Sequence, residues 1–167
     1  VSKEGGLGVI SSVGTGYFMD KEFAGKLVAN RPLSEDNFYS RDGFEAIIKS
    51  ARSIAGDKPL AANILYAISG YGNVVRNACE LGIDIIITGA GLPTNMPEFT
   101  EGYPDVALVP IVSSAKALKI ICKRWKKRYD RLPDAVIVEG PKSGGLQGFT
   151  YEQCKLEEYR LENLVAP

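Results

Sequence analysis

The segment Val136-Ile-Val-Glu-Gly-Pro-Lys-Ser-Gly-Gly-Leu-Gln-Gly-Phe149 joins a short apolar run to a loop with four glycines, and Glu139 stands at the junction. An apolar run of this length is typical of a buried strand. Glycines have no Cβ, so their backbone N–H groups can approach a flat or anionic ligand closely. Because α/β folds place their binding sites where strands end, this segment predicts a strand followed by a ligand-binding loop.

Similar apolar runs occur upstream. Together with the run at 135–138, they predict strands at residues 7–12, 60–65, 83–88 and 106–112. Consecutive apolar positions favour a parallel sheet that is covered on both faces. Apolar residues also recur at helical spacing over residues 44–54, 74–81, 115–121 and 151–164. Asp42 and Glu45 are placed like a capping box at the first of these helices, and Gly82 predicts the end of the second.

This alternation predicts repeated right-handed βα units in a single domain over residues 1–167. A doubly wound sheet and a (β/α)8 barrel both have the pattern. Residues 14–42 interrupt it with a long polar and aromatic stretch, which we interpret as an insertion or lid after the first strand. A complete barrel takes about 250 residues. We therefore expect either a small open sheet or part of a larger protein, incomplete at both ends.

Charge and composition exclude several classes of function. Twenty basic and twenty acidic residues give a formal net charge of zero, so we expect neither a nucleic-acid nor a membrane partner. The basic and aromatic segment 123–129 is interpreted as a solvated helix end whose cations complement the helix dipole. Three widely separated cysteines indicate reduced thiols in the cytoplasm and no metal site. The chain has no histidine, which excludes imidazole chemistry.

Polar and small residues follow the predicted strands. Asn63 lies near the end of an apolar strand, where its amide can bind a ligand or be satisfied in the core. Residues 89–91 form a glycine-rich turn after the next strand, and Ser113 and Ser114 follow the one after, where a helix cap is the simpler interpretation. The segment 139–145 has neither a Walker motif nor the GxGxxG order of a dinucleotide site.

Five segments, taken in order, carry a family resemblance. They are Val1-Ser-Lys-Glu-Gly-Gly-Leu-Gly-Val-Ile10, Pro59-Leu-Ala-Ala-Asn-Ile64, Thr88-Gly-Ala-Gly-Leu-Pro93, Pro110-Ile-Val-Ser-Ser114 and Glu139-Gly-Pro-Lys-Ser-Gly-Gly145. The chain resembles the flavin-dependent nitronate monooxygenases, once called 2-nitropropane dioxygenases, whose fold is shared by flavin-dependent enoyl-acyl carrier protein reductases. The resemblance implies a (β/α)8 barrel with FMN at the carboxyl ends of its strands. The five strands would then be the second to the sixth.

The resemblance also implies residue roles. Asn63 and Glu139 would lie near the FMN ring or its ribityl chain, and Ser143, Gly144 and Gly145 would line the edge of the flavin. Gly89, Ala90 and Gly91 would border the substrate pocket. The family usually has its catalytic histidine directly after the Gly-Gly pair, and Leu146 occupies that position here. The loops that hold the FMN phosphate in the family follow strands seven and eight, which have no counterpart here.

The implied activity is FMN-dependent oxidation of alkyl nitronates with O2, in a cytoplasmic enzyme with a small-molecule substrate. One alternative is an enoyl-acyl carrier protein reductase that uses NAD(P)H. Another is a non-catalytic flavin-binding module, which the leucine at 146 favours. Open strand edges would favour a homo-oligomer.

Overall fold

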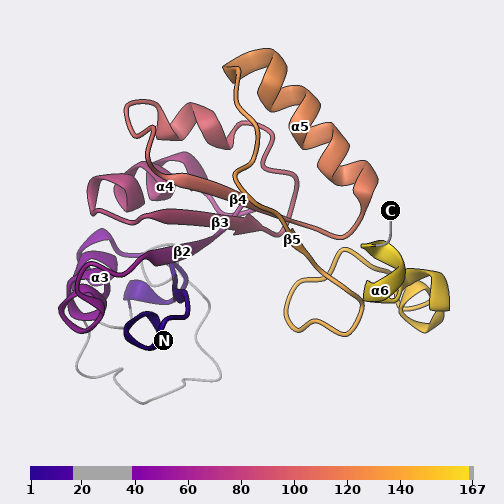
Figure 1. The fold of residues 1–167 in the computed structure, drawn as a ribbon, viewed down its shortest axis with the longest axis horizontal. Coiled ribbons are helices and arrows are strands. Elements are labelled where there is room, and N and C mark those ends of the chain that lie inside the picture. Colours follow the sequence, from indigo (N-terminus) through magenta and orange to yellow (C-terminus); the bar gives the residue numbers. More distant parts are fainter. Residues whose placement is uncertain (17–38, 166–167) are drawn as a thin grey trace.

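Five parallel strands form one sheet in which the spatial order, β1-β2-β3-β4-β5, is the order along the chain (Figure 1). The computed structural model describes residues 1–16 and 39–165. The strands are β1 (Gly8–Ser11), β2 (Leu60–Leu65), β3 (Ile85–Gly89), β4 (Ala107–Val112) and β5 (Ile137–Val138). The helices are α3 (Arg41–Ala55), α4 (Tyr71–Glu80), α5 (Ala115–Tyr129) and α6 (Leu161–Leu164), with 3-10 turns η1 (Ser2–Glu4), η2 (Met96–Thr100), η3 (Gln153–Lys155) and η4 (Glu157–Tyr159).

The strand order decides between the two folds that the sequence left open. A doubly wound sheet reverses its strand order and carries helices on both faces. Here every step along the chain moves to the next strand in the same direction, so right-handed crossovers place all connections on one face. Figure 1 shows α3, α4 and α5 following one another around the outside of the sheet. The chain is therefore a partial (β/α)8 barrel with five of the eight strands.

The two faces of the sheet pack differently. The outer face, with residues such as Ile64, Ile86 and Leu108, joins the helices in one large core. The inner face holds a smaller cluster in its centre, formed by Ala61, Ile87 and Val109. At the edge strands of this face Val9 is 51% and Ile137 40% exposed. The expectation that both faces are covered thus holds for the central strands and fails at the edges.

The predicted strands lie at the correct positions in the chain, but their first and last residues differ from those in the structure. Ile83 and Val106, expected to begin strands, are buried in turns instead. The N–H of Ile83 donates to the carbonyl of Ala78 at 3.1 Å and so completes the end of α4. Gly82 ends this helix as predicted, with a φ of 77°. Apolar residues in these turns fill the core without joining the sheet.

Two helix predictions are wrong. The cap of α3 is Ser40, whose Oγ accepts from the N–H of Gly43 at 3.2 Å, and Glu45 instead forms an ion pair with Lys49 at 2.6 Å. The continuous helix expected over 151–164 is replaced by η3, η4 and the single turn of α6. No residue from 151 to 164 is buried, and a short helix without a packed apolar face is marginal in water.

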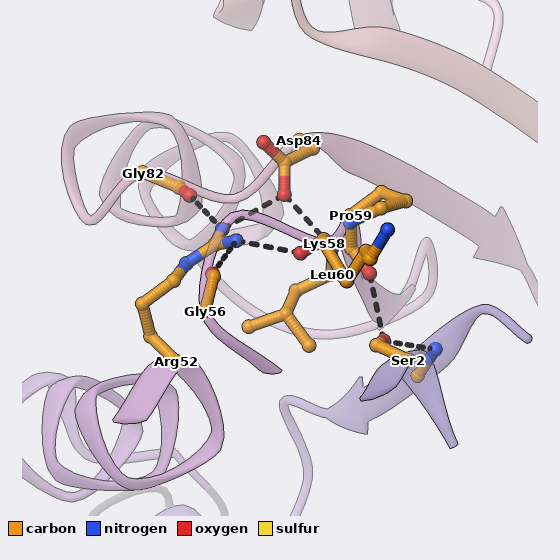
Figure 2. A network of polar contacts seen from close by, with 9 residues as sticks. Ser2, Arg52, Gly56, Lys58, Pro59, Leu60, Gly82 and Asp84 are labelled. Atoms are coloured by element: carbon orange, nitrogen blue, oxygen red, sulfur yellow. Dashed lines mark hydrogen bonds and ion pairs between the residues drawn. The ribbon is translucent and has the colours of Figure 1, made fainter. Parts of the chain in front are cut away.

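A polar network fixes the amino ends of the first three strands (Figure 2). Asp84 accepts from the backbone N–H of Leu60 and from Arg52, both at 2.8 Å. Arg52 also donates to the carbonyl of Lys58 at 2.8 Å. Ser2 connects β1 to this network, because its hydroxyl donates to the carbonyl of Pro59 and accepts from the N–H of Gly8.

The same arrangement recurs two strands further along. Asp134 accepts from the N–H of Leu108 at 2.7 Å and from Arg131 at 3.2 Å. Arg131 donates to the carbonyl of Val106 at 2.6 Å. An aspartate before each of β3 and β5 therefore holds the start of the preceding strand, with an arginine beside it. We call Asp84 with Arg52, and Asp134 with Arg131, the two aspartate clamps.

Most of the predicted insertion or lid at 14–42 lies outside the described residues. Its described flanks meet at the buried Thr15, whose Oγ1 accepts from the N–H of Ser40 at 2.8 Å and donates to the carbonyl of Ser40 at 3.1 Å. The chain therefore leaves β1 and enters α3 at nearly the same point. In the described ranges no helix combines the length and apolar character that a membrane crossing requires.

Candidate active site at the carboxyl ends of the strands

A cavity of about 750 Å³ opens at the carboxyl ends of the strands, whereas the aspartate clamps lie at their amino ends. Every strand or the loop after it contributes to its wall. The described lining residues are Ser11, Val13, Asn63, Leu65, Gly89, Ala90, Gly91, Leu92, Ile111, Val112, Ser113, Ala117, Glu139, Gly144, Gly145, Leu146, Gln147 and Gly148. Convergence at this edge follows from the parallel sheet, because parallel strands all end on the same side.

Eight of the nine residues singled out from the sequence line this cavity. The exception is Ser143, which lines a neighbouring cavity of about 600 Å³ together with Glu139 and Ile111. The Oγ of Ser143 is buried and has no hydrogen-bond partner among the described residues. The glycine-rich loop therefore lies between two cavities, with Gly144 and Gly145 lining the larger one and Ser143 the smaller one.

Asn63 lines the cavity and carries a buried, unpaired acceptor. It lies opposite Ser11 and Ile87 in the sheet, and its backbone carbonyl accepts from the N–H of Ser12 at 3.1 Å. Its side-chain Oδ1 is buried with no partner in the described part of the chain. Leaving such a group unpaired costs about 1–3 kcal/mol. A ligand N–H would satisfy it, and the flavin ring carries one.

The loop after β3 has a strained backbone beside the cavity. Ala90 has a φ of 56°, in the left-handed region that residues with a Cβ rarely adopt. At Gly91, with a φ of 138°, an added Cβ would stand 2.7 Å from Cδ1 of Tyr66. Glycine is therefore required at 91 in this conformation. Strain of this kind gathers at ligand-binding loops, where the surrounding structure imposes it.

Across the cavity, the loop after β5 offers open backbone. Gly145 has a φ of 83°, and an added Cβ at Gly144 or Gly145 would meet nothing within 4 Å in the described structure. These glycines leave room for a flat ligand. Leu146 follows with its side chain 67% exposed. The amide of Gln147 donates to the carbonyl of Ser143 and steadies the turn.

The cavity has little acid–base capacity. Glu139 is the only ionisable side chain among its described lining residues. Its backbone N–H donates to the carbonyl of Val112 at 2.8 Å, which fixes it where β5 ends. The described residues contain no cluster of metal-ligating side chains.

Two buried groups lie outside the site. Burial raises the pKa of the Tyr71 hydroxyl, which pairs with Thr88 Oγ1 at 3.2 Å on the helical side of β3. Burial also raises the pKa of the Cys79 thiol to about 11. Both groups are held neutral at ordinary pH. Cys79 thus packs in the core, whereas Cys154 is exposed.

Several lining residues were missed from the sequence. Ser11 could have been found from the period of two along β1, since it points to the same face as Val9 and pairs with Asn63. For Ser113 and Ser114 the sequence allowed either a ligand contact or a helix cap, and the structure gives one role to each. Ser114 caps α5 by accepting from the N–H of Ala117 at 3.2 Å, and Ser113 lines the cavity. Nothing in the sequence pattern around Gln147 indicated that it would line the cavity.

The residues present fit the ring of a flavin better than its phosphate. The unpaired Oδ1 of Asn63 and the open glycines at 144 and 145 suit a flat heterocycle with an N–H donor. The described wall of the cavity includes no lysine or arginine for a phosphate. Fold and cavity together define a barrel-type α/β protein with a candidate ligand site at the carboxyl ends of its strands.

Comparisons with known proteins agree with this class. The sequence model of the family described as nitronate monooxygenase matches residues 1–167, and the chain belongs to that family. Two similar solved structures are FabK from Thermotoga maritima and a mutant of it. Each is 25% identical with a TM-score of 0.54 over 64% of this chain. The chain spans only 31% of the first and 33% of the second. No curated protein matches it.

Proposed function

We propose that this chain forms the flavin-ring side of an FMN-dependent oxidoreductase that oxidises alkyl nitronates with O2. Membership of the nitronate monooxygenase family supports the cofactor class. FMN would supply the electron transfer, taking electrons from the organic substrate and passing them to oxygen. Asn63 would accept from the ring N–H, and Gly144 and Gly145 would let the ring approach the backbone.

The observation that carries the choice of substrate is the small number of proton-transfer groups in the described wall of the cavity. Glu139 is the only ionisable group in the described wall, and position 146 holds an aliphatic leucine. A nitronate is already deprotonated and needs no base before it gives up electrons. Reduction of an enoyl thioester ends with a proton added to carbon, which needs a positioned acid. The cavity therefore favours the nitronate.

Oxygen uptake by the FMN-loaded protein tests the proposal. We expect turnover with an alkyl nitronate and none with the neutral nitroalkane before it ionises in solution. NADPH with an enoyl thioester should give no reduced product. Reduction of the enoyl thioester at a comparable rate would reverse the choice of substrate. FMN binding is measured by flavin fluorescence, and a failure to bind FMN would contradict the proposed function as a whole.

Replacing leucine at 146 separates an enzyme from a non-catalytic flavin-binding module. In Leu146→His, an imidazole at this cavity wall adds a general base, a contribution worth about 10²–10⁴-fold where positioned correctly. We expect the variant to gain oxygen uptake with the neutral nitroalkane, rising with pH as the imidazole loses its proton. Leu146→Gln is the matched control, because it adds polarity without a titratable group. If both variants and the parent bind FMN but turn over nothing, the binding module is favoured.

A further inference from the structure

Helix α5 concentrates positive charge on the outside of the molecule. Seven of its 15 residues are lysine or arginine, and none is acidic, in a chain whose formal net charge is zero. Four of these cations and Ile120 surround a groove of about 490 Å³ along the helix, lined by Ile120, Lys123, Arg124, Lys127 and Arg128. We call this the α5 groove.

Helix stability does not account for this charge. Cations in the last turn complement the helix dipole, as the sequence interpretation held. Lys116, however, lies in the first turn, where a cation opposes the dipole and where no acidic residue is present. The pairs Lys123/Lys127 and Arg124/Arg128 have four-residue spacing, at which like charges destabilise a helix.

Local partners do not account for it either. Lys126, which does not line the groove, forms an ion pair with Asp130 at 2.6 Å. Arg124 donates to Thr94 Oγ1 at 3.3 Å. Over residues 1–16 and 39–165, the groove residues Lys123, Lys127 and Arg128 have no carboxylate within 4 Å. The groove therefore holds positive charge that the described chain leaves unneutralised.

The aromatic residues of this segment are not available to a nucleic acid. Trp125 is fully buried, and its indole N–H donates to the carbonyl of Pro93 at 2.9 Å. Tyr129 is half-buried with its hydroxyl 3.3 Å from Glu98. Single strands gain much of their affinity from bases stacked on exposed aromatic rings, which this face does not offer. What it does offer is a ridged cationic surface with an aliphatic side chain at one end.

We propose that the α5 groove binds an acidic amphipathic helix of another protein. Carboxylates four residues apart on such a helix lie one turn apart, like Lys123 and Lys127. An adjacent leucine would cover Ile120. Packing of ridges into grooves is the ordinary way in which two helices meet. The surface is separate from the candidate site, since Ala117 is the last α5 residue on the cavity wall and the groove begins one turn later.

Fluorescence anisotropy with a labelled synthetic peptide tests this proposal on the full chain. The peptide is a helix of about four turns, with glutamate at every fourth position and leucine beside it. Its counterpart carries glutamine in place of glutamate. A single-stranded DNA of equal charge is the third probe. We expect the acidic peptide to bind more tightly than either, and binding to weaken at physiological salt, where the Debye length is about 8 Å.

Charge removal locates the surface. The double variant Lys123→Gln/Lys127→Gln should weaken peptide binding about 2- to 30-fold, the loss of two exposed charge pairs. The matched control Lys49→Gln/Lys126→Gln removes the same charge from outside the groove and should leave binding unchanged. Circular dichroism checks that both variants fold. Equal weakening in both variants, equal binding of the glutamine peptide, or tighter binding of DNA would each overturn the proposal.

Discussion

Asn63 carries an unpaired buried acceptor, which lowers stability, at the place where we propose that a ligand binds. An apolar strand otherwise surrounds it, and its Oδ1 is buried without a partner in the described chain. The adjacent Ser11 reaches the same cavity from β1. Because an unpaired buried acceptor lowers stability, its retention at the cavity is consistent with the bound ring N–H that we propose.

Substitution of Asn63 by leucine should therefore separate stability from binding. In Asn63→Leu the unpaired acceptor is gone, so the free energy of unfolding should stay constant or rise by about 1 kcal/mol. The dissociation constant for FMN should rise about 3- to 10-fold with the lost hydrogen bond. Urea unfolding and flavin fluorescence measure the two quantities.

Asn77→Leu is the control for this substitution. Asn77 Nδ2 donates to the Tyr39 hydroxyl at 2.9 Å on α4, outside the cavity. This variant should lose stability and keep its FMN affinity. A loss of stability in both variants would show that Asn63 is an ordinary structural amide.

The cysteines should differ sharply in reactivity. Burial raises the pKa of Cys79 to about 11, so at pH 8 almost none of it is thiolate, the nucleophilic form. Cys154 is exposed. Iodoacetamide should label Cys154 first and Cys79 only after unfolding or as the pH approaches 11, as followed by peptide mass spectrometry. Early labelling of Cys79 in the folded protein would contradict its placement in the core.

At the scale of elements, the residues that end a strand were predictable and those that lie beyond it were not. Asn63 lies near the end of an apolar run, and the turn at 89–91 and Glu139 follow two others. Parallel strands bring these ends together. The orientation of Ser143 depends on how the loop folds back, which no periodicity records.

Helix caps and helices that pack against no sheet were also difficult to predict from the sequence. Asp42 and Glu45 matched a capping box, yet Ser40 two residues earlier makes the cap. Several polar residues near a helix start can compete, and tertiary contacts choose among them. Here Thr15 holds the backbone of Ser40 in place. The failed helix after residue 150 has the opposite cause, since no sheet face receives it.

Thr15 should be important for this junction. In Thr15→Ala the backbone N–H of Ser40 loses its partner, whereas the carbonyl of Ser40 still accepts from the N–H of Phe44 at 2.9 Å. The unpaired N–H should lower the free energy of unfolding by about 1–3 kcal/mol. Thr15→Ser keeps the hydroxyl and should lose much less. Urea denaturation compares the two. If both variants lose the same stability, the methyl group and not the hydrogen bonds holds the junction.

For the whole molecule, the strand order could not be obtained from the sequence by alternation alone. The repeated βα rhythm fits a barrel and a doubly wound sheet equally. The difference lies in which face each crossover takes, and that becomes visible only when the neighbours of each strand are known. The barrel was predicted from the family resemblance of the sequence motifs, and the strand order of the structure then confirmed it.

The two aspartate clamps allow a test of cooperation across the sheet. Asp84→Asn and Asp134→Asn each weaken a charge-assisted bond to a strand start and should each cost about 1–3 kcal/mol. The clamps share no residue. The double variant should therefore lose the sum of the two single losses within about 0.5 kcal/mol, by urea unfolding. A much smaller combined loss would indicate that the two ends of the sheet unfold separately.

The opposite placement of the clamps and the cavity has a consequence for how this protein can change. Residues that hold the starts of the strands lie at one end of the sheet, and residues that line the cavity lie at the other. Variation at Leu146 or Gln147 can thus alter chemistry while leaving the anchors at Asp84 and Asp134 intact. A library of substitutions restricted to the loop after β5 should consequently return mostly folded variants, which makes that loop the place to begin selecting for new substrates.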